Sequence, residues 1–352
     1  MSDAPDQLLR VAAQVEKRLI TLFEREGAHW RAVDLRLGEA VDQLGAVLTG
    51  GGKRLRAAFC YWGWRGVHPD AADETAIIDA GAAFELLQAF ALIHDDIMDD
   101  SGTRRGRPTI HVDQAQRLRD QGWHGEPRRF GEGVAILVGD LGHAYADQLM
   151  AGIHADARTV WDELRIELNL GQYLDLRSAA AGELDQATAH QVSMYKSALY
   201  TIVRPLQLGA NLEGRANGAV IEGLDDYGRP LGRAFQLKDD LLGVLGDAET
   251  LGKPVGEDLR EGKPTELLAV ALERAGTAQR ALLDGVGRRS LTAEQVAAIV
   301  EVLHDTGAVS EIEARIAKLV GVSTAHAADL PFDNVAKEAL TALAEYVASR
   351  TS

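Results

Sequence analysis

The sequence has little cysteine, little proline and few aromatic residues. Of its 352 residues, one is cysteine, 9 are proline and 5% are aromatic. The single cysteine, Cys60, excludes an intramolecular disulfide and is typical of a reducing compartment. Scarce proline together with abundant alanine and leucine favours helices. We therefore expect a helical, cytoplasmic protein that folds without disulfides.

Positive charge is also in short supply. Lys and Arg total 37 against 53 Asp and Glu, so the net charge is −16. This balance argues against nucleic acid or an anionic membrane surface as a broad partner, although local basic clusters can still hold anions. The first residues lack the apolar core of a signal peptide. The longest apolar stretch, 76–93, contains Asp79 and Glu85, so we expect a buried helix and no integral membrane segment.

Almost every segment has a helical period, and no strict apolar/polar alternation is long enough for a strand. Residues 134–149 show one apolar stripe of large residues, among them Leu137. In 290–305, Thr292 and Gln295 have the spacing of a capping box. The glycine- and proline-rich breaks are too short for a clear linker. We predict roughly ten to thirteen helices in a single all-α domain over 1–352.

The most unusual stretch is "HDDIMDDSGTRRG", residues 94–106. On a helix, Asp95 and Asp99 lie one turn apart on one face, as do Asp96 and Asp100. Two such carboxylates can hold Mg²⁺, which completes its shell with water and phosphate oxygens. The aspartates end an apolar helix, where the helix dipole disfavours negative charge. The pattern therefore predicts a metal site, and the alternative is a solvated acidic helix end.

Three arginines follow the aspartates: Arg104, Arg105 and Arg107. Guanidinium groups bind phosphate oxygens in bidentate geometry. Carboxylates for a metal, followed by arginines for the remaining phosphate charge, are what a metal–diphosphate complex requires. Adjacent arginines alone are more often plain surface charge.

A second acidic pair, Asp239 and Asp240, lies in "AFQLKDDLLGVLGD" near the end of an apolar helical run, with Gln236 one turn earlier. The position one turn after Asp239 is Gly243, so this motif offers a metal fewer ligands than the first. A third motif, "GGGKRLRA" at 50–57, places Lys53 where a helix begins, which suits an anion. It lacks the spacing of a P-loop, and the alternative is a glycine turn before a basic helix.

In this order the motifs resemble those of the trans-isoprenyl diphosphate synthases, the polyprenyl synthetase family. The resemblance extends from "GGKRLRA" to "GEDLREGKPT" and includes "ILVGD", "GQYLDL", "YKSALYT" and "FQLKDDLLGVLGD". It implies a large helical bundle of the isoprenoid synthase type around a deep central apolar cavity, and a homodimer. It also implies a Mg²⁺-dependent condensation of isopentenyl diphosphate with an allylic diphosphate (dimethylallyl, geranyl or farnesyl) by ionisation, condensation and elimination.

The resemblance also assigns site residues by position. Metal ligands are expected at Asp95, Asp96, Asp99, Asp239 and Asp240, for three Mg²⁺ ions that Mn²⁺ can replace. The allylic diphosphate is expected on Arg104, Lys196, Gln236 and Lys253, beside Ser197 and Lys263. Isopentenyl diphosphate is expected on Gly52, Lys53, Arg56, Gln88 and Arg105. Of these, the residues expected to be catalytic are Asp95, Asp99, Arg104, Lys196 and Asp239.

The chain departs from the family pattern at three positions. Gly243 replaces the last aspartate of the second motif, Ser197 stands where threonine commonly follows the lysine, and Ala57 replaces the usual proline. Gly243 predicts a weaker second metal site. In this family the fifth residue before the first aspartate helps set the product length, and here it is Phe90. An aromatic residue there predicts a C20 product, geranylgeranyl diphosphate, although Ala91 lies nearer the Asp95 face.

Other functions remain open at this stage. The first is a synthase of C15 or longer products. The second is a terpene cyclase of the same fold, which has no need of the basic "GGKRLR" and "RRG" elements. The third is a non-catalytic regulatory subunit, which is expected to lack the metal aspartates. The fourth is a Ca²⁺-binding structural protein, which leaves the arginines and lysines unexplained.

Overall fold

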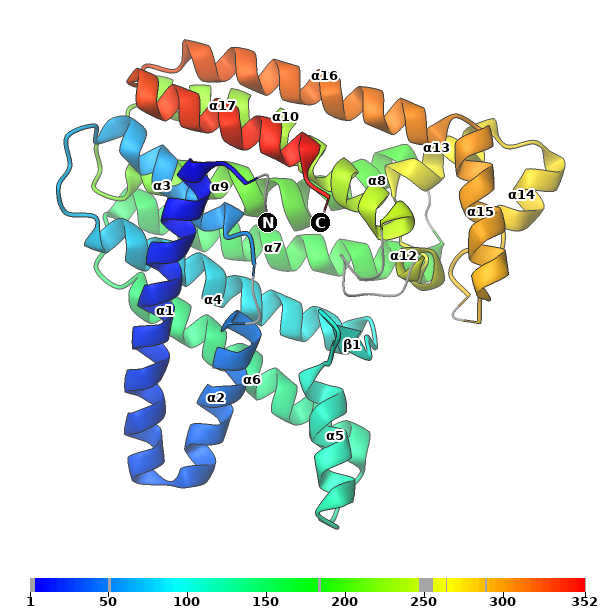
Figure 1. Ribbon diagram of the computed structural model, residues 1–352, viewed down its shortest axis with the longest axis horizontal. Helices are drawn as coiled ribbons and strands as arrows, with labels where there is room; N and C mark the ends of the chain where they lie inside the picture. Colours follow the sequence, from blue (N-terminus) through cyan, green and yellow to red (C-terminus); the bar gives the residue numbers. More distant parts are fainter. Residues whose placement is uncertain are drawn as a thin grey trace. The chain divides into compact units, whose positions relative to one another are not determined.

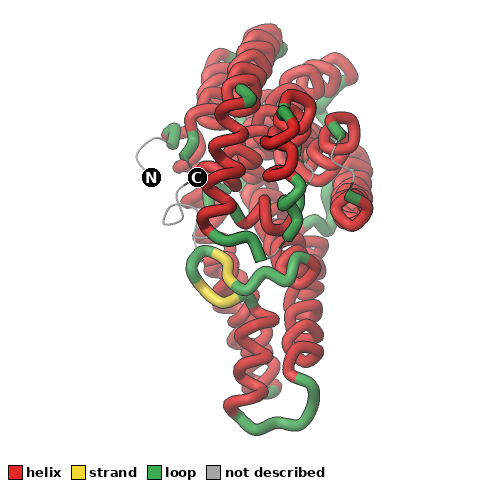
Figure 2. Tube along the Cα trace, turned by 90° about the vertical axis from the view of Figure 1, so that its right-hand side faces the viewer, coloured by secondary structure: helices red, strands yellow, loops and turns green. Residues whose placement is uncertain are grey.

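The computed structural model describes residues 4–49, 52–182, 185–246, 256–263, 265–288 and 290–351. Helices make up nearly all of this part of the chain, and the strands within it are one pair of two residues each (Figure 2). The all-α fold class is confirmed. Lys253, expected on the allylic diphosphate, lies outside the described residues, as does Asp247 at the end of "FQLKDDLLGVLGD".

The chain divides into two compact units, which we describe one at a time. Residues 6–61 and 70–153 form the first-motif unit, and residues 1–5, 62–69 and 154–352 form the second-motif unit. The division falls inside the helix α3 (Leu55–Val67) and not at a linker. The single domain over 1–352 and the central cavity both stay predictions.

The first-motif unit is built on α4, which packs against α1, α2 and α6 (Figure 1). Its other elements, besides the start of α3, are α1 (Asp6–Val33), α2 (Leu35–Thr49), α4 (Thr75–Met98), β1 (Thr103–Arg104), β2 (Arg107–Pro108), α5 (Ile110–Asp120) and α6 (Pro127–Leu149). Gly142 lets α6 approach α4 closely, because a Cβ there would lie 3.1 Å from the Leu86 carbonyl oxygen. The site aspartates therefore lie at the end of a tightly packed helix.

The stripe expected to face the core on α6 is wrong in part. Leu137 is 66% exposed, whereas Ala135 and Val138 are buried. Small residues form the packed face because α6 approaches α4 too closely for large side chains. Val138 and Tyr145 of the same stripe are buried, so Leu137 is the member of the stripe that faces outward.

The second-motif unit is organised around α10, which packs against the π-helix η1 and against α16 (Figure 1). Its elements are α7 (Ala155–Ala181), α8 (Gln186–Val192), η1 (Ser193–Val203), α9 (Arg204–Asn211), α10 (Gly218–Leu245), α12 (Glu257–Glu261), α13 (Glu266–Arg274), α14 (Thr277–Leu283), α15 (Ala293–Asp305), α16 (Ala308–Asp329) and α17 (Asn334–Ser349). The Thr292–Gln295 capping box at α15 is confirmed, with both of its hydrogen bonds formed.

The described helices outnumber the ten to thirteen expected from the sequence. The surplus includes α8, α12 and α14, which are 7, 5 and 7 residues long. A helix of two turns or fewer is too short to show an apolar period, so the sequence pattern does not reveal it.

One helix, α4, is long and apolar enough to cross a membrane by length and composition. Most of its most apolar 18-residue window is nevertheless buried inside the protein. The core helix of a globular protein has the same length and composition, and the burial of α4 accounts for its apolar character.

Candidate active site

The first aspartate motif lies at the C-terminal end of α4, as expected. Asp95 and Asp96 are in its last turn, and Asp99 is the C-cap, whose amide donates to the Asp95 carbonyl oxygen over 2.8 Å. Asp100 then turns the chain away with a φ of 53°. The last turn holds no basic residue, so the helix dipole opposes these carboxylates and a cation would stabilise them.

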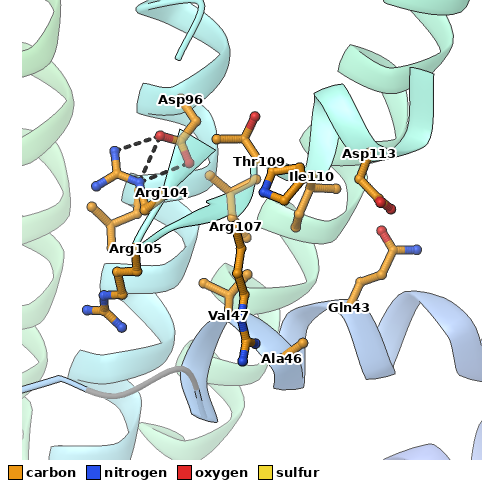
Figure 3. Close-up of a pocket in the computed structure, with 13 residues that line it drawn as sticks. Gln43, Ala46, Val47, Asp96, Arg104, Arg105, Arg107, Thr109, Ile110 and Asp113 are labelled. Carbon is orange, nitrogen blue, oxygen red and sulfur yellow. Dashed lines mark hydrogen bonds and ion pairs between the residues drawn. The ribbon is translucent and has the colours of Figure 1, made fainter. Parts of the chain in front are cut away.

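Asp96 pairs with Arg104, a contact the sequence did not predict. The Arg104 Nη2 atom lies 2.6 Å from Asp96 Oδ1, and its Nε donates to both carboxylate oxygens over 2.8 and 3.0 Å (Figure 3). Asp95 is farther, with Oδ2 4.0 Å from Nη2. Burial opposes the charge of Arg104, but the hydrogen bond to Asp96 and the surrounding carboxylates raise its pKa overall. Asp96 thereby orients Arg104. Asp95 and Asp99 lie one helical turn apart and share one face of the end of α4.

A tight β-hairpin presents the arginines. β1 and β2 pair antiparallel in the register Thr103↔Pro108. The two-residue turn between them has positive φ at both positions, 51° at Arg105 and 71° at Gly106, as in a type I′ turn. Burial lowers the pKa of Arg105, and the charges of Arg54 and Arg104 lower it further. An anion bound here would relieve that repulsion.

The glycine-rich loop before α3 reaches the same hairpin. A Cβ on Gly52 would lie 3.6 Å from Arg105 Nη2 and 3.4 Å from Arg54 Nη1. Lys53 and Arg56, expected on isopentenyl diphosphate, flank Arg54 and are half-buried. The structure thus brings "GKRLR" beside "RRG".

Arg54, one of the three basic residues of the "GGGKRLRA" motif with Lys53 and Arg56, forms a buried ion pair that the sequence did not predict. Its side chain is 6% exposed, and its Nη1 donates to Glu85 Oε2, also 6% exposed, over 2.6 Å. Its Nη2 donates to the Leu48 carbonyl oxygen over 2.6 Å, and its φ is 55°. The available signal was Glu85, an acidic residue in the apolar stretch 76–93. This pair fixes the loop that carries Lys53.

A cavity of about 450 Å³ opens beside the hairpin (Figure 3). Arg104, Arg105 and Arg107 are among its lining residues, and Figure 3 shows Arg107 reaching toward Val47 and Ala46 of α2. The remaining lining residues are Gln43, Leu92, Ile93, Asp96, Pro108, Thr109, Ile110 and Asp113. A pocket with three arginines and apolar walls suits an anionic ligand with a hydrocarbon part.

The second aspartate motif lies near the end of α10 and has two unlike carboxyl groups. Asp240 is buried, and Gln236 donates to its Oδ1 over 2.6 Å. Burial raises the pKa of Asp240 well above its usual value, and the charges of Asp258 and Asp239 raise it further against the hydrogen bond from Gln236. Asp239 is 41% exposed. The two carboxyl groups thus differ in burial and in their hydrogen-bond partners.

Arg350, which follows α17, pairs with Asp239, another contact that the sequence did not reveal. Its Nη2 donates to Asp239 Oδ1 over 2.6 Å and to the Phe235 carbonyl oxygen over 3.0 Å. Its guanidinium carbon lies 4.1 Å from the centre of the Phe235 ring. Arg350 is buried and follows α17, far from α10 in the chain, so no local pattern links the two residues.

Lys196 lies on η1, a π-helix of 11 residues, a conformation often found at functional sites. Its Nζ lies 2.5 Å from Oδ2 of Asp175 on α7, and Ser197 is half-buried beside it. Asp175 belongs to "GQYLDL", and its role was not assigned from the sequence. Gly171 permits the close contact of the two helices, since a Cβ there would lie 2.5 Å from the Lys196 amide nitrogen.

The remaining predicted residues are placed as follows. Lys263 Nζ lies 2.8 Å from Glu261 Oε2 and 3.3 Å from Asp258 Oδ1. Gln88 is on α4, and its buried Oε1 has no hydrogen-bond partner among the described residues. Phe90 is half-buried, with its ring centre 4.6 Å from that of His94 and 5.2 Å from that of His143 on α6. Ala91 is also half-buried.

Within the described residues, no three His, Cys, Asp or Glu side chains converge on a metal-binding point. The donor chemistry nevertheless fits Mg²⁺, which typically takes one or two protein carboxylates and obtains its other ligands from water and substrate phosphate. Asp95 with Asp99, and Asp239 at the second motif, are carboxylates of that kind.

Comparisons with known proteins show what the whole chain is similar to. The chain is 33% identical over 314 residues to a short chain isoprenyl diphosphate synthase of Methanothermobacter thermautotrophicus, covering 86% of this chain and 88% of the relative. It is 30% identical over 322 residues to the octaprenyl diphosphate synthase of Escherichia coli, covering 89% and 90%.

Among solved structures, the chain is similar to a geranylgeranyl pyrophosphate synthase of Corynebacterium glutamicum complexed with isoprenyl diphosphate and magnesium. That likeness has a TM-score of 0.91 and 36% sequence identity, and covers 97% of this chain and 99% of the other. Residues 39–303 match the profile of the polyprenyl synthetase family. The chain therefore belongs to the polyprenyl synthetase family.

Proposed function

We propose that the protein condenses isopentenyl diphosphate with an allylic diphosphate in trans and releases inorganic diphosphate. The observation that carries this proposal is the pair Asp95 and Asp99 at the end of α4, next to a hairpin that presents Arg104 and Arg105. Membership of the family and the relatives named above support it. Each carboxylate and arginine has a use in this reaction.

Diphosphate leaves carbon readily only when its charge is neutralised. Bound Mg²⁺ supplies most of that neutralisation as a Lewis acid. We propose that Asp95 and Asp99 hold it at the first motif and Asp239 at the second. Arg104, held by Asp96, and Lys196 are proposed to bind the oxygens of the allylic diphosphate. Arg105, with Lys53 and Arg56, is proposed to bind isopentenyl diphosphate. Its double bond attacks the allylic carbon once the bond from that carbon to the diphosphate oxygen has broken, and the condensed intermediate then loses a proton to the released diphosphate.

An elongation assay tests the proposal. The purified protein is incubated with Mg²⁺, isopentenyl diphosphate and each primer in turn (C5, C10 and C15), and the products are sized by chromatography. We expect at least one primer to be extended by C5 units, and no product when Mg²⁺ is chelated. Absence of elongation with every primer would contradict the proposal. Release of a hydrocarbon from a primer alone would indicate a cyclase instead.

The product is proposed to be geranylgeranyl diphosphate, C20. Phe90 lies five residues before Asp95, about 140° around the helix from it, and its ring packs against His143 of α6. The relatives named above include a short chain synthase and an octaprenyl synthase, so their names do not determine the product length of this protein.

Replacing Phe90 with alanine should lengthen the product by at least one C5 unit, because the ring then no longer limits the space between α4 and α6. Product sizing with each primer measures this. Phe130→Ala is the matched control, since that α6 ring contacts Trp123 and should leave the product unchanged. An unaltered length in Phe90→Ala would rule out Phe90 as the limiting residue and turn attention to Ala91.

We also propose that each active site binds three Mg²⁺ ions, which Mn²⁺ can replace, and that the protein is cytoplasmic.

We propose that the protein is a homodimer. The dimer is supported by exposed apolar residues at helical spacing on α7, where Ile166, Leu170 and Tyr173 are 60%, 60% and 66% exposed. Such a stripe favours a protein partner of similar character. Sedimentation equilibrium of a dimer would give a mass of twice 37.9 kDa. A mass of 37.9 kDa, that of one chain, would contradict the dimer.

A further inference from the structure

Gly243 leaves the second aspartate motif without a carboxylate one turn after Asp239, and the structure shows what fills the space. A Cβ built on Gly243 would lie 1.9 Å from Oδ2 of Asp258 and 2.8 Å from its Cγ. The carboxyl group of Asp258 therefore occupies the volume that a side chain at position 243 would take. Positions 239 and 243 share one face of α10, because they are one helical turn apart.

We propose that Asp258 supplies the metal-binding carboxylate that Gly243 lacks, so that Asp239 and Asp258 form the carboxylate pair of the second motif. The carboxylates of this pair come from two helices, α10 and α12, whereas Asp95 and Asp99 both lie at the end of one helix, α4. This inference rests on the proposed function, since it concerns the metal ions of that reaction.

The backbone around Asp258 is well placed to hold it there. α12 lies between Gly256 and Gly262, whose φ angles of 75° and 72° reverse the chain at both ends. Leu259 is completely buried, and its carbonyl oxygen accepts from the Gly287 amide over 2.8 Å. α12 packs against α10. Asp258 is thus presented by a short anchored helix.

The charges around Asp258 also suit a metal–diphosphate ligand. Its side chain is 18% exposed, and its Oδ1 lies 3.3 Å from Lys263 Nζ, while Oδ2 is the oxygen nearest Gly243. Asp240 is turned into the protein, where Gln236 donates to it. A carboxylate in the space at position 243, on the face of α10 that carries Asp239, together with Lys263 near its other oxygen, would provide both a metal ligand and a cation for phosphate.

Metal binding without turnover tests the inference. Free Mn²⁺ is measured by electron paramagnetic resonance as the protein is titrated in the presence of dimethylallyl S-thiolodiphosphate, which does not ionise. We expect Asp258→Ala and the isosteric Asp258→Asn to weaken one class of Mn²⁺ site by at least tenfold. The exchanged variant Gly243→Asp/Asp258→Ala should restore binding to within about threefold of the wild type, because it returns the carboxylate to α10. Asp226→Asn, an exposed acid on the same helix, is the control.

Asp239→Ala separates failure of the inference from failure of the proposed function. If Asp239→Ala weakens one Mn²⁺ site and both Asp258 variants bind like the wild type, Asp258 is not a ligand and the proposed function stands. If the Asp258 variants bind weakly and a folded exchanged variant does not recover, Asp258 is only structural and the inference is again wrong. If Asp239→Ala binds Mn²⁺ like the wild type, the proposed metal site at the second motif is wrong, and with it that part of the proposed function. If the exchanged variant does not fold, the Mn²⁺ affinity of the isosteric Asp258→Asn decides whether Asp258 is a ligand.

Discussion

Replacing Asp95 with asparagine is expected to reduce kcat by about 10³-fold or more, with little change in stability. The substitution keeps the shape of the side chain and removes the charge that we propose holds Mg²⁺ beside the allylic diphosphate. Loss of one well-placed electrostatic group typically costs 10²–10³-fold in kcat, and loss of a metal ligand also removes the Lewis acid. Steady-state kinetics at saturating Mg²⁺ and substrates measures this effect.

Asp100→Asn is a demanding control for this prediction. Asp100 belongs to the same acidic run, but its side chain is 57% exposed and its φ is 53°, a conformation that asparagine adopts readily. We expect its kcat to stay within about threefold of the wild type, since it is not an assigned metal ligand. Equal losses in both variants would mean that the total charge of the run matters, and retained activity in Asp95→Asn would refute the metal assignment.

Replacing Glu85 with alanine is expected to lower the free energy of unfolding by about 3–5 kcal/mol, the usual cost of leaving a buried charge without its partner. Arg54 and Glu85 are each 6% exposed and lie 2.6 Å apart, so Arg54 would keep its charge in a site that water reaches poorly. The loop with Lys53 and Arg56 should also lose its fixed position. We therefore expect a raised KM for isopentenyl diphosphate. Urea unfolding followed by circular dichroism measures the stability.

The double variant Arg54→Met/Glu85→Leu separates charge from packing. Buried ion pairs are often replaced by apolar pairs of similar volume without loss of stability, so most of the stability lost in Glu85→Ala should return. If the double variant is as unstable as Glu85→Ala, the effect comes from packing or from the hydrogen bond that Arg54 donates to the Leu48 carbonyl oxygen. A Glu85→Ala variant as stable as the wild type would mean that the pair contributes nothing.

The features that the sequence predicted correctly are local ones. The helical period and the scarcity of proline gave the all-α class, and the Thr292–Gln295 spacing gave a cap that is formed. The aspartates of the first motif were expected at the C-terminal end of a helix, and they end α4. Each of these follows from residues within one or two turns of one another.

Contacts between distant segments could not be predicted in the same way. Arg350 reaches Asp239 and Asp258 fills the space at Gly243 only because the fold brings separate helices together. The outward position of Leu137 depends on how closely α6 approaches α4, which its apolar pattern does not encode. The pair of Arg104 with Asp96 depends on a two-residue turn with positive φ at Arg105, where glycine or asparagine is usual.

The central claim is that Asp95 and Asp99, together with Asp239, hold the metal ions that bind the allylic diphosphate. It is tested most directly by anomalous diffraction from crystals grown with Mn²⁺ and dimethylallyl S-thiolodiphosphate. We expect manganese peaks within direct coordination distance of all three carboxylates, with each ion also bound to diphosphate oxygens. Diphosphate bound without manganese at Asp95 and Asp99, or manganese at other residues only, would contradict it.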